Sequence, residues 1–376
     1  MKLKGILSAV FAVSLIGSPA YAAGDVNVKV NGIDVACDTI LRDGTTYIPP
    51  RAVSEALGAN VIWDQSTSTA SINMASADEG TLINMVSSVS ESVVAIAGNY
   101  KPQYLSSEAL NYNEGYSFGT GMVIKSSGVI LTNAHVVDEL ENITVIFNNG
   151  ESYPGAVAYK DDKADLAVVK INKLGLKPVT FGSSSDIVPG KTVVAIGTPL
   201  KLSRRNTVTK GIISAAGVEV PDSYFRFTQS DVAINGGNSG GPLFDLNGNV
   251  IGVNTAKTAG IAVEGTSYSI PVDTIQFVIN RYENSQAPLY PEFNASFTES
   301  WEARIGLPTN KGLTVASSSN GVLQTGDVLT AVNGVEVHSN IDVHEAVKST
   351  WTGGEINLTY TRNGSEITSA FSPEYK

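Results

Sequence analysis

The chain has 376 residues, too many for one ordinary hydrophobic core, and this length predicts two or three domains. A formal charge of −11 disfavours a phosphate-binding surface and argues against nucleic acid as the main partner. With 42% hydrophobic and 16% charged residues and 36 glycines, the composition favours a globular protein of short strands and tight turns.

The first 22 residues have the features of an export signal. Lys2 and Lys4 give a positive start, and the apolar run at residues 6–16 is too short to span a bilayer. Ala20 and Ala22 fit the small-x-small pattern of signal peptidase. We therefore expect cleavage after Ala22 and a secreted protein of the bacterial cell envelope, with an uncleaved anchor as the alternative.

Residues 23–75 predict a small α+β module with the only cysteine, Cys37, which we expect to be buried. An alternating run and an Asn-Gly pair indicate a hairpin, and Pro-Pro precedes a short helix. The segments Val-Asn-Gly at 30–32, Tyr-Ile-Pro-Pro-Arg at 47–51 and Val-Ile-Trp-Asp at 61–64 resemble the copper amine oxidase N-terminal-like (stalk) module. The module contains no histidine, so we expect no copper site but a spacer or attachment role, with the cell wall as candidate partner.

The rest of the chain falls into two further units. Apolar residues at helical spacing over 82–89 lead into short strands with frequent turns, which predicts an all-β domain at residues 80–284. Within it, the tyrosine-rich insertion at 100–116 is interpreted as a functional loop. Residues 285–295 carry two prolines and are interpreted as a linker, and residues 296–376 predict a small α/β unit.

A glycine-rich octet carries the strongest chemical signal. A serine hydroxyl is a weak nucleophile that needs an adjacent base and N–H groups to stabilise the oxyanion. Glycines on both sides of Ser239 let the backbone turn tightly and approach a substrate. A plain hairpin turn is the alternative, but the full run Gly-Gly-Asn-Ser-Gly-Gly-Pro-Leu at 236–243, followed by an apolar strand, favours a catalytic serine.

Only one histidine is placed to act as the base for this serine. His338 and His344 belong to the C-terminal unit, whereas His135 follows an apolar run at 128–131 in the β-rich region. A lone histidine at a strand end is more often structural or exposed. Its pairing with the serine octet nevertheless favours His135 as the general base.

The carboxylate that orients this histidine is assigned to Asp165. It opens the apolar run 166–171, where a half-buried carboxylate can hold the imidazole in one tautomer. Asp161 and Asp162 precede it in a polar turn and are interpreted as a solvated pair. The resulting chain order of histidine, aspartate and serine is that of the chymotrypsin arrangement.

Four segments together resemble the HtrA/Deg family of serine proteases. They are Gly-Thr-Gly-Met-Val-Ile at 119–124, Thr-Asn-Ala-His-Val-Val at 132–137, Asp-Leu-Ala-Val-Val-Lys-Ile at 165–171, and the run at 235–243. The resemblance covers about residues 81–376. It implies an all-β, chymotrypsin-like double β-barrel followed by a PDZ domain that binds peptide C-termini, and a homotrimer that needs no metal or organic cofactor.

The resemblance also implies roles for further residues. The oxyanion hole would use the backbone N–H groups of Gly237 and Ser239. The floor of the specificity pocket would lie at Ala233 and Ile234, which carry no charge, so we expect cleavage after small or medium aliphatic residues.

In the PDZ domain, the resemblance implies a carboxylate-binding loop at residues 304–307. Its peptide-binding residues would be Ile305, Gly306 and Leu307.

The sequence thus predicts a serine endopeptidase that cleaves unfolded or misfolded polypeptides without ATP, through the triad His135, Asp165 and Ser239. Two alternatives remain open. The chain could be a chaperone or peptide-binding scaffold with a latent triad, or an attachment protein whose N-terminal module does the main work.

Overall fold

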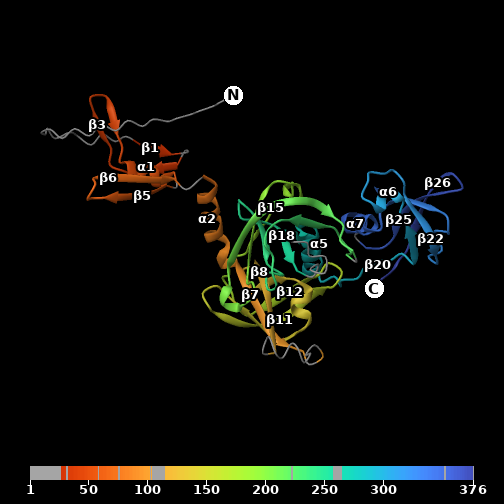
Figure 1. Ribbon diagram of the computed structural model, residues 1–376. Coiled ribbons are helices and arrows are strands. Elements are labelled where there is room, and N and C mark those ends of the chain that lie inside the picture. The colour runs from red at the N-terminus through yellow and green to blue at the C-terminus, as the bar shows by residue number, and fades with distance from the viewer. Residues whose placement is uncertain are drawn as a thin grey trace. The chain divides into compact units, whose positions relative to one another are not determined.

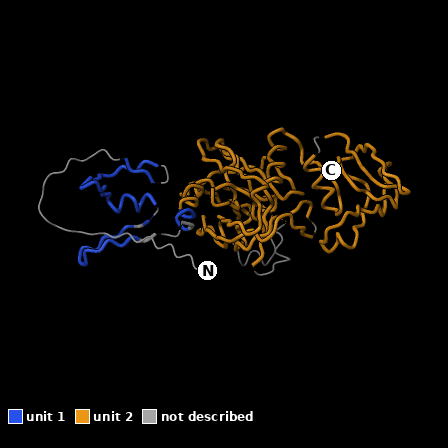
Figure 2. The backbone as a smooth tube through the Cα atoms, turned by 90° about the horizontal axis from the view of Figure 1, so that it is seen from above, with its two compact units in different colours: residues 1–83 blue, residues 84–376 orange. Residues whose placement is uncertain are grey.

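The computed structural model describes residues 27–375, except 31–32, 58, 75–76, 102, 104–114, 222, 257–264 and 351–352. It divides into two compact units, Met1–Ile83 and Asn84–Lys376, which Figure 2 colours separately. Within the described residues, no helix combines the length and the apolar character needed to cross a membrane. The predicted export signal and most of the 100–116 insertion lie outside the described residues.

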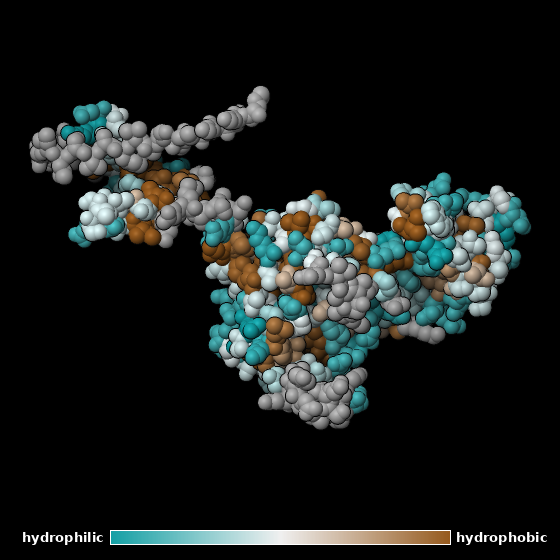
Figure 3. Space-filling view, in the orientation of Figure 1, coloured by the Kyte–Doolittle hydropathy of each residue, from teal (hydrophilic) through white to brown (hydrophobic). Residues whose placement is uncertain are grey.

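The described residues of unit 1 form three hairpins, the helix α1 (Pro50–Ala56) and the first part of α2 (Ala77–Val89). The hairpins are β1 (Val28–Val30) with β2 (Ile33–Val35), β3 (Ile40–Arg42) with β4 (Thr45–Tyr47), and β5 (Ala59–Asp64) with β6 (Thr69–Met74). Pro50 occupies the first helical position, where its missing N–H costs no hydrogen bond. Large apolar side chains such as Ile33 and Trp63 remain exposed, and Figure 3 shows apolar surface on this unit. Cys37 is half-buried rather than fully buried.

The first barrel of unit 2 follows α2 (Ala77–Val89). Its strands are β7 (Val93–Tyr100), β8 (Tyr116–Lys125), β9 (Val129–Thr132), β10 (Leu140–Ile146), β11 (Ser152–Asp161) and β12 (Leu166–Ile171). They close in the order β10-β11-β12-β9-β8-β7. Figure 1 labels four of them, β7, β8, β11 and β12. Every residue of β9 is buried, and a short helix, α4 (Ala134–Asp138), follows this strand directly.

The second barrel contains six strands in a ring and one attached strand, β13 (Thr180–Phe181). The ring strands are β14 (Thr192–Gly197), β15 (Thr207–Val218), β16 (Phe227–Ser230), β17 (Pro242–Asp245), β18 (Asn249–Thr255) and β19 (Ser267–Pro271). Pairing of β18 with β19 closes the ring. The amphipathic helix α5 (Val272–Glu283) then buries Ile275 and Val278.

The C-terminal part is a sheet in the order β21-β22-β23-β25-β26 with helix α7 (Asn340–Thr350). Its elements are β21 (Ala295–Thr298), α6 (Trp301–Arg304), β22 (Leu313–Ser318), β23 (Val328–Val332), β24 (Val335–Glu336), β25 (Ile356–Arg362) and β26 (Ser365–Phe371). The strand β20 (Pro291–Glu292) pairs with β27 (Glu374–Tyr375). The segment 285–295 is therefore only partly a linker, because Tyr290 and Phe293 are also buried.

Candidate functional site

The end of strand β9 and the start of β12 bring His135 and Asp165 together. Nδ1 of His135 lies 2.8 Å and 3.0 Å from the two carboxylate oxygens of Asp165, whose carboxylate also accepts the backbone N–H of His135 at 3.0 Å. Bonded in this way, Nδ1 carries the proton and Nε2 is the basic nitrogen. The imidazole is 28% exposed and the Asp165 side chain 11%, so the ring can reach a substrate while the acid stays shielded.

The backbone at Asp165 takes an unusual conformation, with φ at +52°. Aspartate tolerates this left-handed region better than most residues. The carbonyl of Asp165 accepts the side-chain N–H of Asn133 at 2.8 Å and the backbone N–H of Ala134 at 3.1 Å. Contacts within the first barrel therefore fix both the backbone carbonyl and the carboxylate of Asp165, and the carboxylate faces His135.

The two acids that precede Asp165 differ in their surroundings. Asp162 is exposed and pairs with Lys160, as expected, but the prediction that Asp161 is solvated is wrong. Asp161 is fully buried, and its carboxylate accepts the Tyr290 hydroxyl at 2.6 Å and the Ala164 N–H at 3.1 Å. Burial raises the pKa of this carboxyl group above its ordinary value. The sequence gave no sign of this, because Tyr290 lies far along the chain.

The loop that carries Ser239 makes a tight turn at a glycine. Gly237 has φ at +99°, and a Cβ at this position would lie 2.1 Å from the carbonyl oxygen of Thr198, so only glycine fits. The Gly236 carbonyl accepts the N–H of Leu200 at 2.9 Å and points away from the loop. Among the hydrogen bonds of the described residues, none uses the N–H of Gly237 or Ser239.

The hydroxyl of Ser239 has a different partner from the one that the triad requires. Its Oγ accepts the N–H of Ala256 at 3.0 Å. Within the part of the chain that the structure describes, no hydrogen bond joins this oxygen to the imidazole of His135. Hydrogen bonds of this kind are often long before substrate binds, so the arrangement is compatible with catalysis.

Two threonines that the sequence did not single out support the site. The Thr120 hydroxyl donates to the Gly237 carbonyl at 2.7 Å and accepts the Thr198 N–H at 2.9 Å, so strand β8 holds the turn before Ser239. The Thr255 hydroxyl lies 3.3 Å from Oδ2 of Asp165. Thr120 lies inside the 119–124 motif, which was a usable signal, whereas Thr255 had none.

The predicted pocket residues lie just before the serine loop. Ile234 is partly buried and packs against the core cluster of the second barrel, which includes Ile213 and Val232. Ala233 is exposed, and its carbonyl accepts the Thr209 hydroxyl at 3.2 Å. None of these contacts brings a charged group next to Ala233 or Ile234.

In the C-terminal sheet, the predicted peptide-binding residues and the groove beside the open sheet edge lie in different places. Ile305, Gly306 and Leu307 follow helix α6 and are exposed. The groove beside an edge strand, where a peptide could add as a further strand, lies instead between β21 and α7. Residues 293–297 line it, and these were assigned to the linker or left without a role.

The described strands form two six-stranded barrels, and contacts between these barrels lie at Asp165 and at Ser239. Followed by a sheet with an open edge, this arrangement defines the chymotrypsin-like fold with a PDZ domain. Family models agree: a trypsin-like peptidase domain matches residues 119–253, and a PDZ domain matches residues 308–370. A copper amine oxidase N-terminal domain matches residues 23–117, which extends beyond the last strand of unit 1.

Comparison with curated proteins and solved structures gives the family. The chain is 33% identical over 279 residues to the serine protease Do-like HtrA of Lactobacillus helveticus, covering 68% of each protein. It is 37% identical to the putative serine protease HhoB of Synechocystis sp., covering 65% of this chain and 63% of that relative. The chain belongs to the HtrA/DegP family of serine proteases.

Two further comparisons bear on the fold and on chain length. The structure of the HtrA-type protease AlgW with a tripeptide matches with a TM-score of 0.64 and 28% identity, over 78% of this chain and 96% of that one. A serine endoprotease from Yersinia pestis matches with a TM-score of 0.59 and 26% identity, over 78% and 97%. The chain spans only 56% of a probable periplasmic DegP-like endoprotease of Hahella chejuensis, at 35% identity.

Proposed function

We propose that this protein is a secreted serine endopeptidase that cleaves unfolded or damaged polypeptides at the bacterial envelope. The observation that carries this proposal is the bonded pair of His135 and Asp165 beside a glycine-rich loop that presents Ser239. Relatives named as periplasmic serine endoproteases support the location. The family resemblance supports assembly as a homotrimer.

In the proposed mechanism, Oγ of Ser239 attacks the peptide carbonyl and Nε2 of His135 takes the hydroxyl proton. Asp165 keeps the imidazole in the tautomer that leaves Nε2 basic, and it stabilises the positive charge that forms. The N–H groups of Gly237 and Ser239 bind the oxyanion. His135 then returns the proton to the leaving amine, and water releases the acyl group by the reverse sequence.

The proposed specificity follows from the uncharged residues before the serine loop. Ala233 and Ile234 offer no partner to a basic side chain, so cleavage after residues such as valine or alanine is favoured. One methylene group changes binding by roughly 1–3 kcal/mol, so this specificity is loose. A peptide library cleaved mainly after arginine or lysine would contradict it.

One observation favours a second candidate function, a peptide-binding chaperone with a latent triad. The Ser239 hydroxyl accepts the N–H of Ala256 rather than bonding to His135. A chain locked in this state would bind unfolded polypeptides through its PDZ domain without cleaving them.

Labelling with a fluorescent fluorophosphonate separates the two functions, because this reagent reacts only with an activated serine. The endopeptidase proposal expects labelling of the wild type, located at Ser239 by mass spectrometry, together with casein digestion. The Ser239→Ala variant should show neither. Protection of unfolded protein from aggregation without labelling or digestion would establish the chaperone function instead.

A further inference from the structure

The groove between β21 and α7 can take an extended peptide, and the pairing of the edge strand predicts the direction in which that peptide runs. It has a volume of about 410 Å³, and Phe293 just before the edge strand and Phe297 within it line the groove together with Val343 of α7. On its other side β21 pairs with β22 in antiparallel register. A peptide that continues this antiparallel pattern ends with its C-terminus beside residues 291–293, just before the edge strand.

Two charged side chains from different domains lie along this groove. Lys163 comes from the turn of the first barrel that carries Asp165, and Glu292 comes from strand β20. The Lys163 ammonium lies 5.2 Å from the ring centre of Tyr224, whose ring stacks at 3.7 Å on the imidazole of His344 in α7. No salt bridge within the described residues involves Lys163.

The histidine in this groove is neutral at physiological pH. Burial, with a smaller contribution from the nearby Lys163 charge, lowers the pKa of His344 to about 4. Of the described residues that line the groove, Lys163 is therefore the one that carries a positive charge. A ligand carboxylate at this end of the groove would meet the ammonium of Lys163.

We propose that Lys163, a residue of the protease domain, completes the peptide site of the PDZ domain by pairing with the C-terminal carboxylate of the bound peptide. This inference rests on the proposed function in one respect, which is that the ligands are the C-terminal ends of polypeptides. It assigns a binding role to the turn that holds Asp165. Glu292 weakens the binding of a free C-terminus, because its negative charge repels the carboxylate of the peptide.

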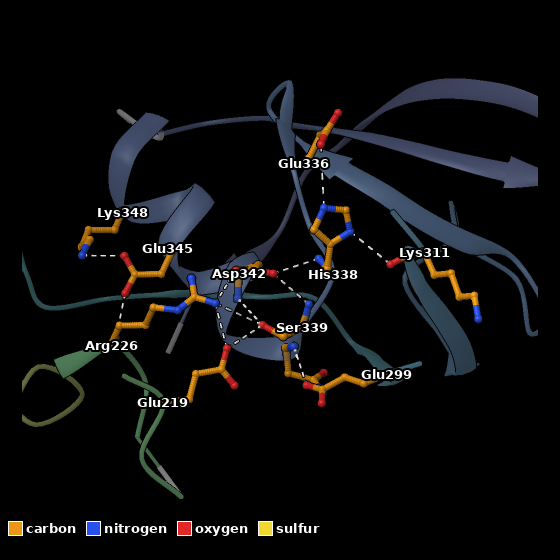
Figure 4. Close-up of polar contacts among 11 residues, drawn as sticks. Glu219, Arg226, Glu299, Lys311, Glu336, His338, Ser339, Asp342, Glu345 and Lys348 are labelled. Atoms are coloured by element: carbon orange, nitrogen blue, oxygen red, sulfur yellow. Dashed lines mark hydrogen bonds and ion pairs between the residues drawn. The ribbon is translucent and has the colours of Figure 1, made fainter. Parts of the chain in front are cut away.

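The composite site requires the two domains to stay docked, and polar contacts at their interface supply this (Figure 4). The Arg226 guanidinium lies 2.7 Å from Asp342 and from Glu219, and its backbone N–H donates to Glu345 at 2.8 Å. The buried ammonium of Lys348 lies 2.7 Å from Asp273 at the start of α5. These contacts keep α7, and with it the groove, against the protease domain.

The test measures binding of fluorescein-labelled hexapeptides, each prepared as the free acid and as the C-terminal amide, with every natural residue at the last position. All proteins are the full chain in the Ser239→Ala background, so that no peptide is cleaved. For the peptides that bind, we expect the free acid to bind the wild-type groove roughly fivefold more tightly than the amide. In Lys163→Met, the acid should lose its advantage, and the remaining charge of Glu292 should make it bind no more tightly than the amide.

Two further variants sharpen the result. Lys170→Met removes another exposed lysine of the same barrel and should keep the wild-type preference for the acid. Glu292→Gln should increase that preference by about twofold to fivefold. Rising salt should reduce the preference in the wild type, since salt screens exposed charges.

Equal binding of acids and amides by the wild-type groove, or an unchanged preference in Lys163→Met, would overturn the proposal. Fluorophosphonate labelling of the same variants with Ser239 intact keeps the two proposals apart. Labelling without a carboxylate preference would refute only the role of Lys163, and a preference without labelling would refute only the protease activity.

Discussion

The proposed acid–base pair is held mainly by a side-chain contact within the first barrel, whereas the proposed nucleophile of the second barrel is held mainly through its backbone. Asp165 binds both the ring nitrogen and the main-chain N–H of His135, so the imidazole is oriented before substrate arrives. Ser239 is held through its own carbonyl, which accepts the Thr120 N–H at 2.8 Å, while its hydroxyl bonds to Ala256. The proposed acid–base pair is therefore already joined, whereas the Ser239 hydroxyl is bonded away from the imidazole.

This difference indicates which contacts the His135–Asp165 pair and the Ser239 turn each depend on. The acid–base half depends on one carboxylate and on the turn that carries it. The serine half depends on a turn whose carbonyls point outward, toward Thr120 and Leu200. Substitutions next to the His135–Asp165 pair should therefore affect proton transfer, and substitutions that contact the serine turn should affect oxyanion binding.

The largest effect is expected for Asp165→Asn. An amide cannot impose the tautomer with the proton on Nδ1, so kcat should fall about 10⁴-fold with little change in the fold. Turnover of a fluorogenic peptide measures the loss. The matched control is Asp162→Asn, which changes an exposed acid of the same turn and should leave kcat within about twofold. Comparable losses in both variants would contradict the assignment of the orienting acid.

A smaller effect is expected for Thr120→Val in the serine half. The substitution removes the donor to the Gly237 carbonyl and the acceptor for the Thr198 N–H. The turn before Ser239 should lose its fixed orientation, and kcat should fall by roughly 10²-fold while KM changes little. Thr120→Ser keeps the hydroxyl and should recover most of the activity. An unaltered kcat in the valine variant would show that the turn keeps its conformation without the Thr120 hydroxyl.

The smallest effect is expected for Tyr290→Phe, which tests the support beneath the catalytic turn. Buried Asp161 loses its hydroxyl donor, and the free energy of unfolding should fall by about 2 kcal/mol. Burial holds the folded-state pKa of Asp161 above the unfolded value, so its contribution to stability is present at low pH and is lost as pH rises. Removal of the donor raises this pKa further.

The difference in Tm between wild type and Tyr290→Phe should therefore widen from pH 4 to pH 8. Thermal unfolding followed by circular dichroism measures it. Tyr153→Phe is the control, because that hydroxyl pairs at the surface with Lys173 and should matter little at either pH. A gap that stays constant with pH would mean that Asp161 does not ionise in this range.

Much of the site could be predicted from sequence because its motifs are local. The glycines around Ser239 serve a turn that is complete within a few residues, and an apolar strand before His135 indicates its burial on one side. Asp161 was misread for the opposite reason. Its burial depends on Tyr290, more than a hundred residues later, and no local pattern reveals such a partner.

The peptide groove illustrates the same limit. Two prolines suggested an irregular linker at 285–295, yet Pro291 lies in a short edge pairing, where its missing N–H is harmless. The motif at 304–307 does not show where a strand edge is open. A peptide that adds to a sheet needs an open strand edge, here beside a helix. Which strand is at the edge depends on the order of the whole sheet.

The sequence by itself determined the fold class, the family and the residues expected to carry the chemistry, since these depend on residue type and local spacing. Only the tertiary structure decided how the two barrels share the site, which acid is buried and which groove can take a peptide. Those features arise where segments distant in the chain meet, and burial and charge there are set by neighbours that no local stretch of sequence contains.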